Sequence, residues 1–158
     1  MATIGIFWNW SLKAYAAPET QRACLHLQDQ FGQDVNVILW ACWLASKKRC
    51  PTANALKHCI KITDIWQSGG VVGIRKARRE IKDTPHIESA SALKHQFLNL
   101  ELAFERHEQL ALEALPSQIS PNTLNSSTKI CLHNMKMVAP STDFAHNNAL
   151  ETLSLTLY

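Results

Sequence analysis

Glycine is scarce in this chain, with only 5 among 158 residues, and long runs of β-branched residues are missing as well. Such a sequence offers little material for strands and sharp turns. Alanine, leucine, glutamine, lysine and glutamate are abundant, and all of them favour helices. The composition therefore predicts an all-α protein, a single-domain bundle of about six to seven helices around a central apolar helical hairpin.

The chain also lacks a long hydrophobic run and a leader-like N-terminus. Its most apolar stretch, residues 35–45, is far shorter than the roughly 20 residues that cross a bilayer. Five cysteines without C-x-x-C spacing indicate reduced thiols rather than a disulfide framework. We therefore expect a soluble, cytoplasmic protein that has no membrane partner.

No catalytic or metal-binding motif stands out. The nearest candidates for a zinc site are Cys42, Cys50, His58 and Cys59. Cys42 and Cys59 lie at apolar helix positions, where a free cysteine behaves as a small hydrophobic residue. We expect no metal, no cofactor and no enzymatic activity.

A group of four glutamates follows later in the chain: Glu101, Glu105, Glu108 and Glu113. A di-metal bundle would need matching Glu-x-x-His partners from other helices, and the sequence offers no second copy. We therefore expect Glu105 and Glu108 to lie on the surface.

The predicted fold is organised around residues 21–46, which have the pattern of two helices joined at Gly32. Asp34 is the expected N-cap of the second helix, because its carboxylate can accept hydrogen bonds from the next free amides. Residues 35–45 are apolar almost all round, which is typical of a helix inside the core. We expect a rigid hub with no interior room for chemistry, so that the protein acts through the charge of its surface.

Other helices are predicted over residues 4–16, 53–66, 71–82, 89–115 and 141–157. Residues 68–70 should interrupt the chain between two of them, and residues 130–138 are ambiguous. The predicted division is a helical core domain over residues 1–115, followed by a linker and C-terminal helix over residues 116–158, packed on the core or partly flexible. A stripe of Leu98, Leu102 and Leu112 is either covered by the domain or forms the seam of a homodimer.

Positive charge is concentrated in one region of the chain. Residues 47–82 contain 10 basic and 2 acidic residues, whereas residues 83–158 contain 4 basic and 8 acidic residues. Such asymmetry favours contact with a polyanion or with an acidic protein. The candidate contact residues are Lys47, Lys48, Arg49, Arg75, Lys76, Arg79 and Lys82.

These residues favour a transcriptional regulator of the silencer type that binds DNA or an acidic protein partner. Contacts would go to phosphates, because the second helix of the hairpin lacks the polar side chains that read base edges. One alternative is a binding module or enzyme for an anionic small molecule near Gly69–Gly73, where amides at a helix start can hold a phosphate. The other alternative is a non-catalytic scaffold for protein partners.

Several stretches also resemble a known family. They are FWNWSLKAYA, Pro18, ACLHLQDQFGQDVNVILWACWLA, Trp66 and VVGIRKARREIK. Together they are similar to a small, all-helical, cytoplasmic proteobacterial family of unknown function. The resemblance covers about residues 5–113 and is most specific at residues 27–29 and 34–36. The vibrio type VI secretion regulator TsrA, a silencer of acquired genes, is similar to this family, which implies a role in gene regulation and supplies no catalytic residues.

Overall fold

The computed structural model describes residues 5–82 and 90–158, and its architecture confirms the all-α class. Its elements are α1 (Ile6–Tyr15), α2 (Pro18–Phe31), α3 (Val35–Ser46), β1 (Arg49–Pro51), α4 (Ala53–Trp66), η1 (Gln67–Val71), α5 (Val72–Lys82), α6 (Ala90–Glu113), β2 (Ser117–Ile119), α7 (Ser127–Val138) and α8 (Phe144–Leu157). Among the described residues, none of these helices combines the length and the hydropathy that a membrane span requires.

The turn between α2 and α3 forms as the sequence predicts. Gly32 ends α2 with a left-handed φ of 63°, which a residue without a Cβ adopts at little cost. The Asp34 carboxylate caps α3 by accepting hydrogen bonds from the backbone N–H groups of Asn36 (2.8 Å) and Val37 (3.4 Å). These bonds satisfy amides that have no partner within the helix, so they stabilise the point where α3 enters the core.

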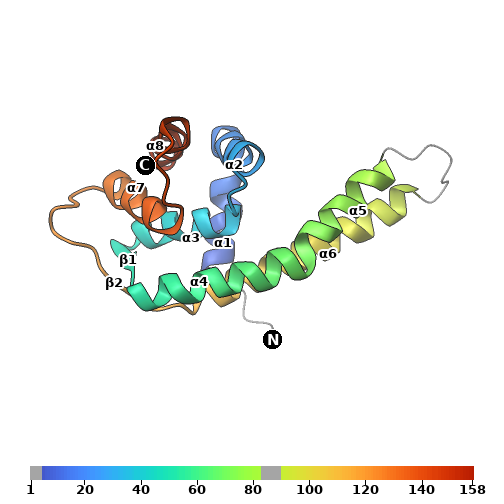
Figure 1. Ribbon diagram of the computed structural model, residues 1–158, viewed down its shortest axis with the longest axis horizontal. Helices are drawn as coiled ribbons and strands as arrows, with labels where there is room; N and C mark the ends of the chain where they lie inside the picture. The colour runs from blue at the N-terminus through green and yellow to red at the C-terminus, as the bar shows by residue number, and fades with distance from the viewer. Residues whose placement is uncertain (1–4, 83–89) are drawn as a thin grey trace.

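The core is built around α3, which packs against α1, α2, α6 and α7, while α8 packs on α2 and α7 (Figure 1). Every residue from Asn36 to Ala45 is buried, as expected for a helix that is apolar on all sides. The Phe7 ring of α1 lies 5.3 Å from the Trp43 ring, centroid to centroid. Burial of each large apolar side chain contributes roughly 1.5–3 kcal/mol, so α3 is a major source of the stability of the fold.

Residues 116–158 contribute to this same core through α7 and α8. The segment that the sequence left ambiguous, residues 130–138, lies within α7. Ile130 and Met135 of α7 and Leu150 and Leu153 of α8 are buried in one cluster with the side chains of α3. At the end of the chain, Tyr158 Oη donates a hydrogen bond to the carbonyl oxygen of Cys42 (2.8 Å).

A small antiparallel sheet joins the end of α3 to the start of α7, and the sequence did not predict it. β1 pairs with β2 so that Arg49 faces Ile119 and Pro51 faces Ser117. The linker that the sequence places at the start of residues 116–158 therefore contains β2. Asn134 Nδ2 fixes the sheet against the core by donating to the carbonyl oxygens of Ala41 (3.1 Å) and Arg49 (2.9 Å).

The helix break expected at residues 68–70 is wrong, because the chain remains helical there. η1 is a single π-helical turn that connects α4 directly to α5, and both flanking residues, Trp66 and Val72, keep right-handed helical dihedrals. A Cβ on Gly70 would come within 2.5 Å of Phe104 Cε1, so the missing side chain lets α6 approach closely. No helix begins at Gly73, and the phosphate site expected at a helix start is therefore not formed.

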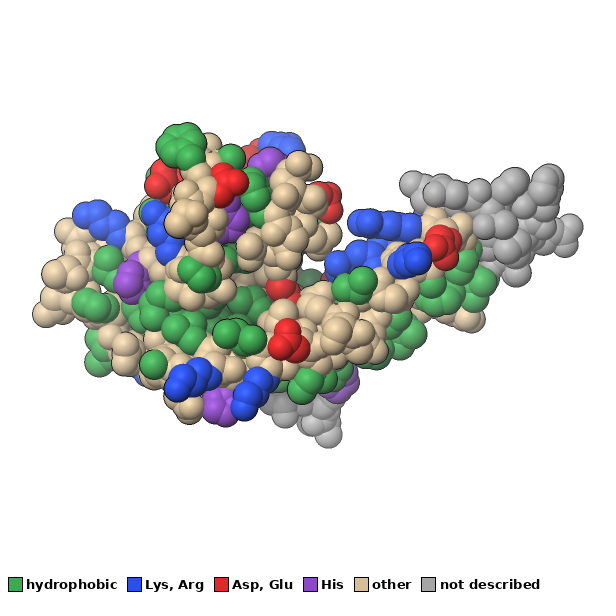
Figure 2. All heavy atoms as spheres, in the orientation of Figure 1, with side chains coloured by type: hydrophobic (Ala, Val, Ile, Leu, Met, Phe, Trp, Pro, Cys, Tyr) green, Lys and Arg blue, Asp and Glu red, His purple; other side chains and the backbone are tan. Residues whose placement is uncertain are grey.

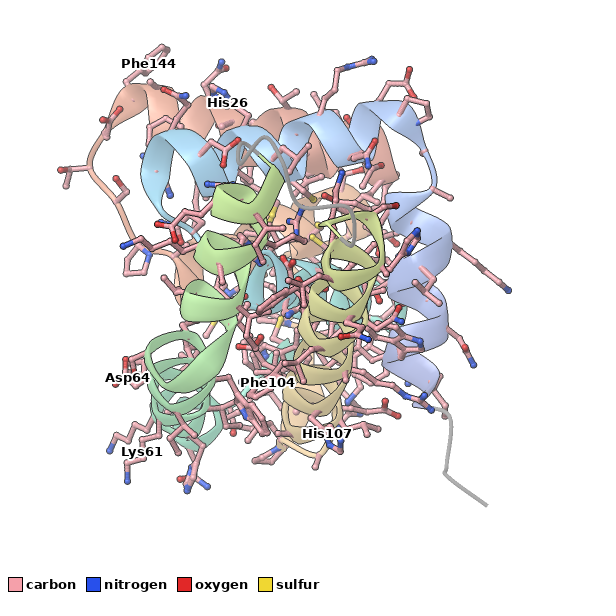
Figure 3. The ribbon with its side chains drawn as sticks, turned by 90° about the vertical axis from the view of Figure 1, so that its right-hand side faces the viewer. His26, Lys61, Asp64, Phe104, His107 and Phe144 are labelled. Atoms are coloured by element: carbon pink, nitrogen blue, oxygen red, sulfur yellow. The ribbon has the colours of Figure 1, made fainter. Side chains whose placement is uncertain are left out.

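α5 packs along the first half of α6, and the two project from the body as a helical hairpin that we call the arm (residues 72–82 and 90–105; Figure 1). Viewed along the arm, Phe104 lies between the two helices, whereas Lys61 and Asp64 of α4 point away from them (Figure 3). At the base of the arm the Trp66 ring meets the Phe104 ring edge to face at 5.8 Å. Aromatic packing therefore fixes α6 of the arm to the end of α4.

The stripe of Leu98, Leu102 and Leu112, for which burial in the domain and a homodimer seam were the two alternatives, does not lie on one surface. Leu112 is fully buried in the core, whereas Leu98 and Leu102 are 38% and 41% exposed. A dimer contact that includes Leu112 is therefore wrong, because that side chain already packs inside its own chain.

Candidate functional site

The seven predicted contact residues fall into two separate groups. Lys47, Lys48 and Arg49 lie where α3 leads into β1, at the opposite end of the molecule from α5 (Figure 1). Arg75, Lys76 and Arg79 lie on α5, and Lys82 ends that helix with a side chain outside the described residues. The positive charge of residues 47–82 therefore does not form one patch.

The first group makes contacts within the chain. Lys47 Nζ lies 3.9 Å from the centre of the Trp43 ring, a cation–π arrangement. Lys48 Nζ donates to Ser127 Oγ (2.8 Å), and Arg49 Nε donates to Ser117 Oγ (2.6 Å). Lys48 and Arg49 thus connect β1 to the start of α7 and to β2, whereas Lys47 packs on α3.

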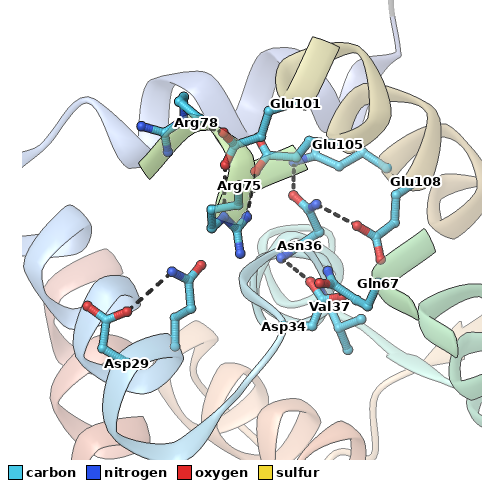
Figure 4. A network of polar contacts seen from close by, with 12 residues as sticks. Asp29, Asp34, Asn36, Val37, Gln67, Arg75, Arg78, Glu101, Glu105 and Glu108 are labelled. Carbon is cyan, nitrogen blue, oxygen red and sulfur yellow. Dashed lines mark hydrogen bonds and ion pairs between the residues drawn. The ribbon is translucent and has the colours of Figure 1, made fainter. Parts of the chain in front are cut away.

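In the second group, Arg75 is not an exposed contact residue, which corrects its predicted role. Its Nε donates to Glu101 (2.8 Å) and an Nη donates to Glu105 (3.3 Å), and its side chain is only 19% exposed. Arg78 Nε donates to the second oxygen of Glu101 (2.8 Å). These ion pairs fasten α5 to α6 (Figure 4), so much of the predicted positive charge is compensated by glutamates.

Lys76 and Arg79 remain exposed on α5. The Lys76 side chain is 76% exposed, and its ion pair with Glu80 is long at 3.8 Å. Lysine and arginine side chains gather on the side of the arm that faces the body, across a notch in the molecular surface (Figure 2). Of the predicted residues on the arm, these two are the ones whose described side chains can meet a large partner.

A buried polar cluster, which the sequence did not reveal, lies where the arm joins the body (Figure 4). Asn36 Nδ2 donates to Glu108 (2.7 Å), and Asn36 Oδ1 accepts from Gln109 Nε2 (2.8 Å). Gln109 Oε1 in turn accepts from Ser11 Oγ (2.8 Å). Glu108 is 0% exposed, so its predicted place on the surface is wrong. Glu105 is also partly covered, beneath Arg75.

Asp34 links this cluster to η1, the turn that joins α4 to α5. One of its carboxylate oxygens caps α3, and the other accepts a hydrogen bond from Gln67 Nε2 of η1 (2.6 Å). Burial, together with the charge and hydrogen bonding of Asp34, raises the pKa of Glu108 to about 9. Glu108 is therefore protonated at neutral pH. Its Oε1 is buried and has no hydrogen-bond partner among the described residues.

The pKa values of Glu101 and Glu105 are shifted in opposite directions. Burial alone would raise the pKa of Glu101, but hydrogen bonds from Arg75 and Arg78 outweigh it and hold that pKa below the usual value. Burial raises the pKa of Glu105 in spite of the opposing charge of Arg75. The pKa of Arg75 is raised, because its bonds to Glu101 and its attraction to both glutamates exceed the effect of burial. Glu101 and Arg75 are thus firmly ionised, whereas Glu105 holds its proton more readily than Glu101 does.

A cavity of about 180 Å³ opens beside this cluster, which corrects the expectation that the hub leaves no room for chemistry. α1 contributes Trp8 and Tyr15 to its wall, α5 contributes Arg75, and α6 contributes Glu105. A wider groove of about 470 Å³ lies beside it. The cavity and the groove share Gln28, Gln33, Asp34, Gln67 and Arg75.

A titratable carboxyl with a raised pKa, next to a fixed guanidinium in a cavity, is a common property of functional sites. The spacing of the glutamates in the sequence gave one indication of this arrangement. Glu101, Glu105, Glu108 and Leu112 recur at intervals of 4, 3 and 4, the period of a buried helix face. Three glutamates on one inward stripe could therefore have indicated a polar site. The residues described by the structure contain no group of three or more potential metal ligands.

Comparison with known proteins supports a family but no activity. A family model described as "Protein of unknown function (DUF2390)" matches residues 6–112, which include the hairpin, the arm and the cavity. Searches of the curated proteins and of the solved structures gave no match. None of these findings links the chain to TsrA or to type VI secretion.

Proposed function

The chain belongs to the DUF2390 family, whose function is unknown, and from this premise we propose that it is a silencer-type transcriptional regulator that contacts duplex DNA through the exposed cations of the arm. The observation that carries the proposal is the exposure of Lys76 and Arg79 on a helical hairpin that projects from the body. By the family resemblance, its targets would include type VI secretion genes or other acquired genes.

The ion pairs within the arm support this assignment. Glu101 and Glu105 take up the charges of Arg75 and Arg78 on the side where α5 meets α6. Lys76 and Arg79 lie away from those pairs and stay accessible. Lys94 is exposed on α6, so the second helix of the arm also carries positive charge. Exposed cations on a projecting hairpin are accessible to the phosphates of a duplex.

The expected contacts are electrostatic and largely independent of base sequence. Cations that bind phosphates release counterions from DNA, so affinity falls steeply with salt. Long, flexible side chains such as Lys76 and Arg79 suit contact with the backbone. The protein should therefore bind many duplexes with similar affinity, in the manner expected of a silencer that covers long regions of DNA.

The test is a titration of a labelled duplex with the wild-type protein and with the double variant Lys76→Ala/Arg79→Ala, at several salt concentrations. Loss of two phosphate contacts should reduce the slope of log K against log salt by about 1.8. The matched control is Lys57→Ala/Lys61→Ala, which removes two exposed charges from α4. Arg75 is left unchanged, because its loss would disturb the junction of α5 and α6.

Three outcomes of this titration would argue against direct DNA contact. The wild type does not bind at about 50 mM salt, the arm variant binds as the wild type does, or the α4 variant loses as much affinity as the arm variant. An acidic protein would then be the partner to seek, with the same pair of variants as the first comparison.

A further inference from the structure

The cavity beside the buried polar cluster contains several hydrogen-bonding groups that the chain does not use. Gln33 and the Tyr15 hydroxyl make no side-chain hydrogen bond with other described residues, although both line the cavity. Gln67 donates through Nε2 to Asp34, which leaves its amide oxygen available. Arg75 uses Nε and one Nη for its glutamates, so its other Nη can still donate. A ligand in this space would meet both donors and acceptors.

The charge around the cavity does not favour an anion. Arg75 is the cation among its lining residues, and it is already balanced by Glu101 and Glu105. Asp34 adds a further carboxylate to the wall, and both of its oxygens accept hydrogen bonds from the chain. A phosphate or carboxylate placed here would face two carboxyl groups and a guanidinium that is already paired. A neutral ligand avoids that repulsion.

The remaining lining is apolar and partly aromatic. Trp8, Leu12 and Tyr15 share one face of α1, and Leu102 lies on the α6 side of the cavity. Aromatic side chains stack well on flat rings. The volume of about 180 Å³ is below the roughly 300–1,000 Å³ of pockets for drug-sized ligands, so only a small molecule fits. A ring with two apolar faces and a polar edge matches both kinds of lining.

We propose that the cavity formed by α1, the end of α2 with the α2–α3 turn, α3, η1, α5 and α6 binds a small, neutral, planar heterocycle with donors and acceptors along its edge, of the size of a single nucleobase. Trp8 and Tyr15 provide the aromatic contact, and Gln33, Gln67 and the remaining Nη of Arg75 bind the edge. This inference does not depend on DNA binding by the arm, because the cavity shares no residue with the pair Lys76 and Arg79.

The test measures binding of adenine, cytosine and hypoxanthine to the full chain by isothermal titration calorimetry. Adenosine monophosphate is the charged comparison, since it adds a phosphate to the same ring. A ligand of this size should bind with a Kd of about 10–1,000 μM. We expect at least one free base to bind, with little dependence on salt, and adenosine monophosphate to bind more weakly than adenine.

Two pairs of variants locate the binding. Leu102→Trp fills the cavity and should weaken binding at least about tenfold, because a bulky side chain takes the place of the ligand. The control Leu100→Trp changes a leucine of similar exposure on the same helix, 45% against 41%, that does not line the cavity. Gln33→Leu should weaken binding about fivefold through one lost hydrogen bond, whereas Gln30→Leu, a change of an exposed neighbouring residue, should leave binding unchanged.

The proposal fails if none of the three bases binds at millimolar concentration, or if adenosine monophosphate binds more tightly than adenine. It also fails if Leu100→Trp weakens binding as much as Leu102→Trp. The Gln33 variant keeps the test valid if Leu102→Trp does not fold, because Gln33 makes no side-chain hydrogen bond that the described fold would lose.

Discussion

Replacement of Glu108 by glutamine tests the buried polar cluster most directly. In the folded protein one oxygen of Glu108 accepts a hydrogen bond from Asn36 Nδ2 (2.7 Å), and the other, Oε1, is buried with no hydrogen-bond partner among the described residues. A glutamine amide offers the same acceptor and donor in nearly the same shape. The variant Glu108→Gln therefore preserves the contacts of the protonated carboxyl while it removes the ability to titrate.

The size of the effect follows from the shift in pKa. Burial and Asp34 raise the pKa of Glu108 from 4.5 to about 9 on folding. Below the unfolded pKa both states hold the proton. Between the two values only the unfolded chain releases it, and each pH unit lowers the free energy of unfolding by about 1.4 kcal/mol. From about pH 5 to about pH 7 this single group should therefore cost the wild type up to about 2.7 kcal/mol.

Urea denaturation at both pH values measures this difference. The stability of the variant relative to the wild type should increase by up to about 2.7 kcal/mol between about pH 5 and about pH 7. Contributions of Glu105, whose pKa is also raised, are present in both proteins and largely cancel. The control Glu19→Gln, an exposed residue of α2, should show no such change with pH. If Glu108→Gln differs from the wild type by the same amount at both pH values, Glu108 is not a buried neutral acid.

Two further pairs of variants test the fold by thermal or urea denaturation. Gly69→Ala should stabilise the protein by up to about 1 kcal/mol, because η1 continues the helix and nothing lies near the added Cβ, whereas Gly70→Ala should destabilise it by about 1–3 kcal/mol through the clash with Phe104. Equal effects of the two changes would contradict the continuous helix. Leu112→Ala should lower the free energy of unfolding by about 2.7–5 kcal/mol, whereas Leu98→Ala, a change of a 38% exposed residue, should lower it much less. A larger loss from Leu98→Ala than from Leu112→Ala would contradict the burial of Leu112.

The elements that the sequence predicted well are those whose causes are local. The left-handed Gly32 and the Asp34 cap act within a few residues of the helices that they end or begin. The buried character of α3 follows from its own composition. β1 and β2 escaped prediction because strands of three residues carry almost no pattern of their own, and their partners, such as Cys50 and Gln118, lie far apart in the sequence.

The electrostatics of the surface depend on contacts that sequence order does not reveal. The count of charges over residues 47–82 included Arg75 and Arg78, and Arg75 was predicted to contact a partner. Their partner Glu101 lies 26 and 23 residues further along the chain. The turn chemistry at Gly69 and Gly70 suggested a break, whereas the close approach of Phe104 makes glycine useful inside a helix. Both errors arose because packing between α5 and α6 decides the role of these residues.

The buried glutamates also explain where a functional site can lie in a protein whose core was expected to leave no room for chemistry. Carboxyl groups cost free energy in an apolar interior unless they are paired or protonated. Here Glu101 is paired with arginines and Glu108 is protonated. Arg75 belongs to this arrangement, lines the cavity, and directly precedes Lys76 on the exposed side of the arm. Among the described residues, the polar cluster, the cavity and the exposed cations of the arm therefore meet at the base of α5. Variants of α5 that leave Arg75 unchanged can separate DNA binding by the arm from ligand binding in the cavity.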